Sequence, residues 1–180
     1  MIEYQWRITK YNPAYRSKQG CYTNNEWTSF YDVGKNYSGR VFAIEEYLQV
    51  EEKYVNAIIN LMLAAKVPYL VVRNLYKWEQ DFKFMEYYSN RMIKLYNCVK
   101  NGYEIQGEDL REMIKLVLRE NLGCQLFNNS NMYVHFGYDY YMYVGTNNSC
   151  SDTLEEIRKD GLFVEQCKSP YLNIDNSNDE

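Results

Sequence analysis

The fold is decided by the stretch Met132-Tyr-Val-His-Phe-Gly-Tyr-Asp-Tyr-Tyr-Met-Tyr-Val144. Residues that can be buried occupy every second position in it, without a break. Side chains on a strand point to opposite faces in turn, so every second residue shares a face. One face can be buried throughout and is the predicted core face; it holds Met132, Val134, Phe136, Tyr138, Tyr140, Met142 and Val144. The predicted outer face is aromatic and polar-tipped and holds Tyr133, His135, Gly137, Asp139, Tyr141 and Tyr143.

Two secondary structures are compatible with this stretch. The unbroken alternation favours one long strand, bent at Gly137, where a bulge or a close backbone approach is expected. The alternative makes Gly137-Tyr138-Asp139 a turn between two short strands. We favour the single strand, because a turn would make the continuing alternation accidental.

His135 and Asp139 share the predicted outer face and suggest an acid and a base. Four residues of extended strand span about 13 Å, whereas a catalytic hydrogen bond needs about 3 Å. We therefore expect a partly buried histidine whose ring is satisfied by a neighbouring hydroxyl or carbonyl. An enzyme that uses His135 with Asp139 or a tyrosine is kept as a third hypothesis.

The composition is that of an ordinary acidic domain with many tyrosines. The chain has 180 residues, 20 of them tyrosine, and a formal net charge of -4. The mean hydropathy of -0.59 and the pI near 5.2 fit a water-exposed chain with no membrane-length apolar run. Acidic balance opposes nucleic-acid binding and makes a basic protein partner electrostatically easier.

Cysteine usage and the first residues favour a cytoplasmic location. The five cysteines are widely spaced and include no Cys-x-x-Cys pair, which is typical of reduced thiols. With a single histidine, the sequence predicts neither a metal site nor a cofactor. The first residues, Met-Ile-Glu-Tyr-Gln-Trp-Arg, lack a basic region followed by an apolar stretch, so no secretory signal is expected.

Helices and further strands are predicted from periodicity. Apolar residues recur at three and four positions in the predicted helices, which cover residues 43–66, 108–121, 151–160 and, with a weak pattern, 79–90. The helix at 151–160 is expected to be capped by Ser151 or Asp152. Strands are predicted at residues 3–11, 69–75, 92–99, 103–105, 122–127 and 162–167, besides 132–144. Asn101-Gly102 is expected to close a hairpin between 92–99 and 103–105.

These elements predict an α+β fold. We expect an antiparallel or mixed sheet of about six to seven strands, with about three to four helices mainly on one face. Residues 1–172 would form a single domain and residues 173–180 a flexible acidic tail. A long tyrosine-rich loop over about 11–40 is expected to be ordered. Arg111, Lys115 and Arg119 are expected on a solvated helix face.

No catalytic motif is present. The sequence contains no glycine-rich phosphate loop and no nucleophile elbow. The tyrosines remain as the unusual feature, because they supply large contact area with a polar tip and are enriched at protein interfaces. The candidate binding residues are Arg7, Trp27, Tyr31, Tyr133, His135, Asp139, Tyr141 and Tyr143.

Three segments together resemble a group of small uncharacterised bacterial proteins: WRITKYNP at 6–13, EWTSF at 26–30 and HFGYDYYMY at 135–143. The resemblance covers most of the chain. Some small acidic proteins of such groups look like immunity proteins, which neutralise a toxin, or like inhibitors of a host defence. The resemblance implies no catalytic residue.

Two functions of different classes follow. The first is an interaction protein of immunity or inhibitor type, which blocks a basic site of a protein partner with its tyrosine-rich surface. The alternative is a protein that binds or sequesters a nucleotide-like small molecule, held between Trp27, Tyr31, Tyr133 and Tyr141, with Arg7 or Arg40 at its phosphates. Neither function involves nucleic acid or a membrane.

Overall fold

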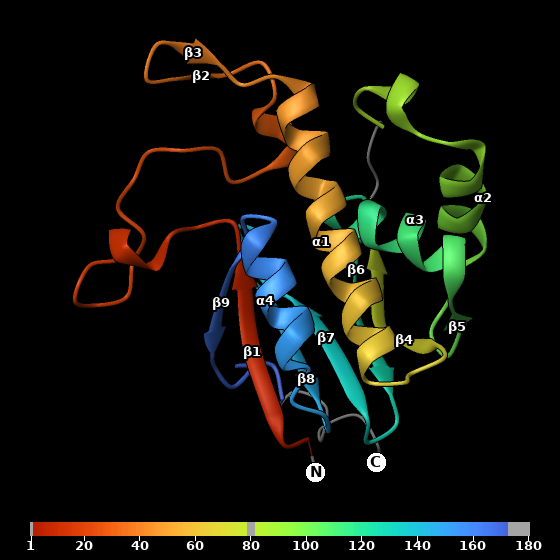
Figure 1. Cartoon of the computed structure of the whole chain (residues 1–180). Helices are drawn as coiled ribbons and strands as arrows, with labels where there is room; N and C mark the ends of the chain where they lie inside the picture. Colours follow the sequence, from red (N-terminus) through yellow and green to blue (C-terminus); the bar gives the residue numbers. More distant parts are fainter. Residues whose placement is uncertain (1, 79–81, 173–180) are drawn as a thin grey trace.

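The computed structural model describes residues 2–78 and 82–172 and has an α+β fold (Figure 1). Its main sheet has seven antiparallel strands in the order β5-β4-β6-β7-β8-β1-β9, and a second sheet pairs β2 with β3. The strands are β1 (Tyr4–Thr9), β2 (Asn36–Tyr37), β3 (Arg40–Val41), β4 (Leu70–Lys77), β5 (Glu104–Ile105), β6 (Leu122–Asn128), β7 (Met132–Phe136), β8 (Met142–Thr146) and β9 (Phe163–Gln166).

Four α-helices accompany the sheet in the described part of the chain: α1 (Ile44–Ala64), α2 (Asn90–Cys98), α3 (Gly107–Leu118) and α4 (Ser151–Lys159). Helix α1 contacts α3 and α4, and α2 contacts α3. In Figure 1, α1 and α4 lie side by side in front of the sheet. The predicted fold class is confirmed.

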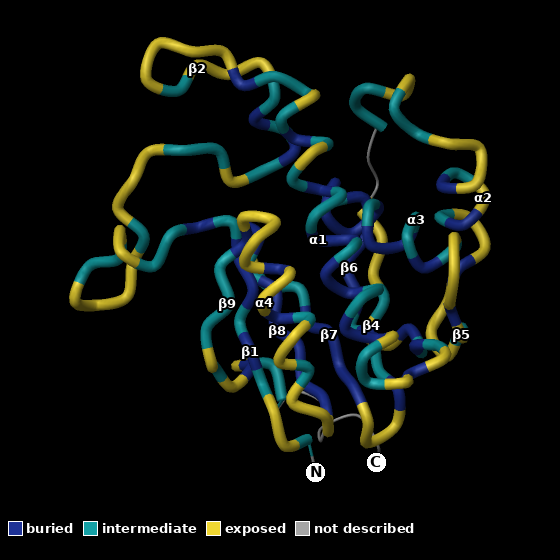
Figure 2. The backbone as a smooth tube through the Cα atoms, viewed as in Figure 1, coloured by how far each residue is buried: buried dark blue, intermediate teal, exposed yellow. Residues whose placement is uncertain are grey.

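One connected core holds the molecule together. It joins alternate residues of the central strands, such as Leu126, Val134 and Val144, to the apolar stripe of α1, such as Val55 and Ile58. Figure 2 shows the buried backbone concentrated in the central strands and α1, whereas the β2–β3 hairpin and the loop before it project from this body.

The stretch 132–144 is two strands and not one. Strands β7 and β8 pair antiparallel, with Met132 opposite Thr146 and Phe136 opposite Met142. The prediction of one long strand is wrong, and the turn between two short strands is the structure. The chain reverses because Asp139 and Tyr140 adopt left-handed backbone conformations, with φ of 53° and 62°.

A second correction concerns residues 92–99, which were predicted as a strand of a hairpin. They belong to α2, whose buried residues are Met92 and Leu95. The side chain of Ser89 caps this helix by accepting a hydrogen bond from the backbone N–H of Met92 at 3.0 Å. The Asn101-Gly102 turn exists, but it connects a helix to β5, and β5 pairs with β4.

Two smaller predictions are also wrong. Helix α4 begins after Cys150, which gives it no side-chain cap, instead of at a capping Ser151 or Asp152. Arg119 is buried and not on a solvated face: its guanidinium donates two hydrogen bonds of 2.7 Å to the carboxylate of Glu51 on α1. The predicted tail, residues 173–180, and residues 79–81 of the weak helix lie outside the described residues.

Candidate binding cleft at the β7–β8 turn

The hydroxyl groups of two tyrosines hold the β7–β8 turn in place through hydrogen bonds to the backbone. The hydroxyl of Tyr54, on α1, donates to the carbonyl of Tyr140 at 2.7 Å, and the hydroxyl of Tyr140 donates to the carbonyl of Leu118 at 2.8 Å. Within the turn, the N–H of Gly137 donates to the carbonyl of Tyr141 at 2.7 Å. With Tyr140 buried as the anchor, Tyr138 is left 87% exposed at the tip.

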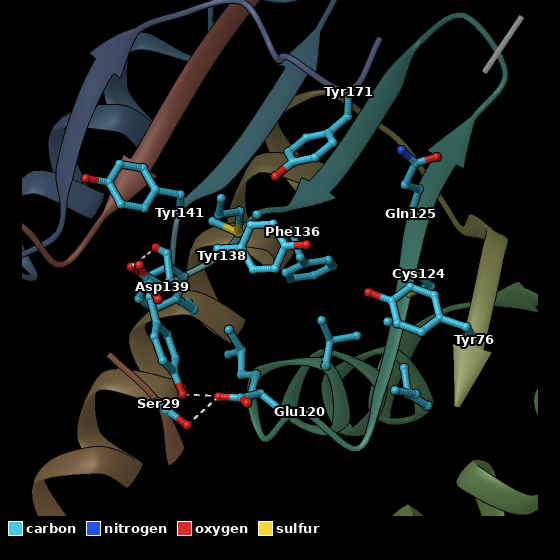
Figure 3. Close-up of a pocket in the computed structure, with 18 of the residues that line it drawn as sticks. Ser29, Tyr76, Glu120, Cys124, Gln125, Phe136, Tyr138, Asp139, Tyr141 and Tyr171 are labelled. Atoms are coloured by element: carbon cyan, nitrogen blue, oxygen red, sulfur yellow. Dashed lines mark hydrogen bonds between the residues drawn. The ribbon is translucent and has the colours of Figure 1, made fainter. Parts of the chain in front are cut away.

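A cleft opens beside this turn because the sheet divides there. The pairing of β6 with β7 ends at Gln125 and His135, whereas the pairing of β6 with β4 continues to Leu122 and Lys77. Beyond Gln125, β6 therefore separates from β7. This leaves a space with β4 on one side and the β7–β8 turn on the other. The space between them has a volume of about 510 Å³ (Figure 3), which lies within the usual range of about 300–1,000 Å³ for ligand sites.

An irregularity in β4 turns an aromatic ring toward this cleft. The register of β4 with β6 shifts by one residue between Arg73 and Tyr76, at Asn74, which has a φ of 50°. Because one extra residue reverses the alternation of faces, Tyr76 stands where Leu75 would otherwise lie. The ring of Tyr76 occupies the space in which a side chain of Gly123 would stand.

Aromatic side chains form a large part of the lining of the cleft. Three of them are exposed although they are apolar in most of their area: Tyr138, Tyr76 at 55% and Trp78 at 39%. Figure 3 shows Tyr76 and Tyr138 on opposite sides of the cleft, with Tyr171 near its upper end. Exposed rings gathered around a hollow are typical of binding surfaces.

Two carboxylates complete the lining. Glu120 follows α3 in a left-handed conformation and accepts a hydrogen bond from the hydroxyl of Ser29 at 2.5 Å. Asp139 is exposed in the turn. Among the described residues, neither carboxylate forms an ion pair, and no lysine or arginine lines the cleft.

Of the predicted binding residues, only Asp139 and Tyr141 line the cleft. Tyr133, His135 and Tyr143, predicted on an exposed outer face, are 2%, 0% and 9% exposed. The C-terminal segment around Ser169 and Tyr171 covers them, and the Tyr171 ring lies 5.9 Å from that of Tyr143. The prediction that this face is exposed is therefore wrong.

His135 has a structural environment. Its Nδ1 lies 2.7 Å from the hydroxyl of Ser169, and its ring stacks on Tyr133 at 4.4 Å. Burial lowers the pKa of His135 to about 4, so the ring is neutral near pH 7. The expected contact with a neighbouring hydroxyl is present at Nδ1, but the ring is fully and not partly buried, and its Nε2 has no hydrogen-bond partner among the described residues. The estimate of about 13 Å between His135 and Asp139 assumed one extended strand and does not apply across a turn. Even so, no hydrogen bond joins the two residues in the described part of the chain.

The remaining candidates lie apart from one another. Trp27 is partly buried against the core, where it stacks on Phe42 at 4.6 Å, and Tyr31 is half-buried. Arg7 donates to the carboxylate of Glu165, 3.0 Å away, on the neighbouring strand. The clamp of Trp27, Tyr31, Tyr133 and Tyr141 proposed for a nucleotide is therefore not assembled around the cleft.

Sequence reasoning missed Tyr76, Trp78, Glu120 and Tyr171. It also placed Tyr138 on the core face, which is wrong, because the turn leaves this side chain 87% exposed in the lining of the cleft. Tyr76-Lys-Trp78 does show an aromatic alternation beyond the end of the predicted strand, which could have extended it. Nothing local in the sequence marks Glu120 or Tyr171, because the fold brings them to the turn from distant positions.

Comparisons with known proteins supply no relative. No family model matches the chain, and searches of curated proteins and of solved structures found no significant similarity. Among the described residues, no helix has the length and apolar character needed to cross a membrane. Nor does that part of the chain hold a group of three or more histidine, cysteine, aspartate or glutamate residues suited to a metal ion.

Proposed function

We propose that this chain is an interaction protein of inhibitor type, which binds a protein partner in the cytoplasm through the aromatic cleft and its rim. The observation that carries the proposal is the exposure of Tyr138, Tyr76 and Trp78 around one hollow. Exposing these rings to water is unfavourable, and a partner that covers them would recover that free energy.

The rim has the character of an interaction hot spot. Tyrosine and tryptophan are enriched among the residues that dominate binding energy, and they cluster where a pocket can be desolvated. Here the rings are held by rigid elements: Tyr76 rests on β6 next to the Asn74 bulge, and the turn that presents Tyr138 is anchored through Tyr140. Such preorganisation reduces the entropic cost of association.

The alternative function is the binding of a small molecule, which the cleft volume of about 510 Å³ favours. A nucleotide fits this cleft poorly, because phosphates are bound by arginine, lysine or backbone N–H groups at a helix start. The described lining has no lysine or arginine and has two carboxylates instead. A nucleotide that raised the melting temperature of the purified chain would support this alternative against the first.

The test begins with a photo-crosslinking amino acid at position 138 in the host cell, with position 15 as the control. Tyr15 is also an exposed tyrosine, at 50%, and does not line the cleft. A partner captured from position 138 but not from position 15 is then purified. Its affinity is measured for the natural chain and for the Tyr138→Ala, Tyr76→Ala and Tyr15→Ala variants.

We expect each of the two cleft variants to weaken binding at least about tenfold, as hot-spot residues do, and Tyr15→Ala to leave it unchanged. The partner's own activity should fall as the natural chain is added. Equal affinities for all the variants, or a partner whose activity is unaffected, would contradict the proposal.

A further inference from the structure

The chemistry of the cleft points to one class of occupant, and this inference rests on the proposed function. The rings of Tyr76 and Tyr138 lie on opposite sides of the space, and Glu120 and Asp139 belong to its lining. Aromatic rings attract cations at their faces, which carry a negative potential, and carboxylates attract cations through their full charge. No cationic side chain of the described lining offsets them.

The nearest comparable arrangement in the same chain already holds an ammonium group. Lys10 Nζ lies 4.1 Å from the ring centroids of both Tyr11 and Trp27, and 2.6 Å from the carboxylate of Glu26. The Lys10 side chain is only 6% exposed. Lys10 is held by these partners and does not line the cleft, although its charge also acts on Asp139. The neighbouring Tyr11 ring stacks on Tyr141 at 5.5 Å.

Other occupants suit the cleft less well. An anionic group would face two carboxylates, and the described lining has no lysine or arginine to bind it. An apolar group would remove water from the carboxylate of Glu120, which accepts one hydrogen bond among the described residues, from Ser29. Burying a carboxylate without enough partners is costly. A cationic group would instead pair with the carboxylates while its alkyl stem packs on the rings.

We propose that the cleft receives a lysine or arginine side chain of the protein partner, with its charged end at Glu120 and Asp139 and its stem between Tyr76 and Tyr138. The charges agree with this assignment: the chain carries a net charge of -4, which also favours approach of a basic surface. The partner's inhibited site is then a basic one, plugged by insertion of its own side chain.

The test uses two short blocked peptides with the order glycine, serine, X, serine, glycine, in which X is arginine or its neutral isostere citrulline. Binding to the ¹⁵N-labelled chain is followed from the amide shifts of Tyr138, Asp139 and Glu120. The arginine peptide should bind about tenfold more tightly than the citrulline peptide, and this preference should shrink as salt is added.

Variants that remove carboxylates test whether Glu120 and Asp139 cause the preference for arginine. Glu120→Gln keeps an oxygen that can accept from Ser29, and Asp139→Asn suits the left-handed backbone of the turn. The doubly substituted chain should lose the preference for arginine. Glu104→Gln, which removes an exposed acidic group of β5 outside the cleft, should retain it.

Equal binding of the two peptides, or a preference that survives in the doubly substituted chain, would overturn the inference. The result separates this inference from the proposed function. If the crosslinked partner still depends on Tyr138 while the peptides show no preference, the cleft binds protein but not through a cation. If the partner does not depend on Tyr138 either, both proposals fail.

Discussion

The ring of Tyr76 lies directly against the backbone of Gly123 in the neighbouring strand. A β-carbon built at position 123 would stand 2.3 Å from Cζ of Tyr76, closer than any real contact. The shifted register at Asn74 brings the two residues opposite each other. An ordinarily weakening glycine within a strand is thus compensated by an aromatic ring from across the ladder.

Gly123→Ala should therefore move the Tyr76 ring out of its place. Because Tyr76 is 55% exposed, the ring can swing into solvent, so we expect a loss of stability of about 1 kcal/mol and a larger loss of partner binding. Urea denaturation of Gly123→Ala, Tyr76→Ala and the double variant measures the coupling. Additive effects of the two substitutions would contradict the contact.

Gly145→Ala should cost more, because the ring beside it has no space to move into. A β-carbon there would stand 2.2 Å from the ring of Tyr133, which is 2% exposed and hydrogen-bonded through its hydroxyl to Gln5 at 2.8 Å. We expect about 2–3 kcal/mol of destabilisation, typical of overpacking. The same urea experiment ranks the two glycines, and an equal or smaller effect at Gly145 would refute this reasoning.

Periodicity predicted most of the fold but not the reversal of the chain at residues 138–140. The residues on either side of the turn, Phe136 and Met142, are opposite each other and six positions apart. Because six is even, the alternation on β8 continues that on β7, and the pattern is the same for one long strand as for two. Only the tertiary anchoring of Tyr140 distinguishes the two cases.

Helix α2 was missed for a different reason. Met92, Leu95 and Val99 recur at helical spacing and are all buried, but the Asn101-Gly102 pair was given more weight as a hairpin signal. The turn is real, with a φ of 82° at Gly102, yet such a turn can also follow a helix. The cleft itself depends on where β6 and β7 separate, which no local pattern records.

The buried pair of Glu51 and Arg119 had a signal in the sequence. Glu51 interrupts the apolar face of α1, where Tyr47, Tyr54 and Val55 are completely buried. A carboxylate at such a position requires a buried cation. The spacing of Arg111, Lys115 and Arg119 placed all three on one helix face, but α3 ends at Leu118 and the chain turns Arg119 inward.

Removing one member of this pair should destabilise the protein strongly. Arg119→Met leaves the Glu51 carboxylate buried without its partner and removes the hydrogen bond to the carbonyl of Tyr87, at 2.8 Å in the natural chain. We expect a loss of about 3–5 kcal/mol. The double variant Glu51→Gln, Arg119→Met should recover a large part of it in guanidinium denaturation. A single variant that cost less than about 1 kcal/mol would mean that the pair behaves as a surface ion pair.

His135 should make the stability of the protein depend on pH in acid. Burial lowers its pKa to about 4 in the folded state, whereas the unfolded chain titrates near 6.5. Above the unfolded value both states are neutral. As the pH falls below about 6.5, only the unfolded state takes up the proton, so stability decreases until the folded ring titrates as well. The loss attributable to His135 between pH 7 and pH 4 is about 3 kcal/mol.

Carboxylates such as Glu165, whose pKa is lowered by its hydrogen bonds to Arg16 and Arg7 against the effect of burial, also lose stabilising interactions in acid. The contribution of the histidine is therefore read as a difference between the natural chain and His135→Gln, whose amide can still meet the hydroxyl of Ser169. Urea denaturation at several pH values should show that the free energy of unfolding falls less for the variant than for the natural chain as the pH decreases from 6.5 toward 4. Parallel curves would mean that the ring takes up its proton in the folded state near its ordinary pKa, and that the C-terminal segment around Ser169 does not keep it from water.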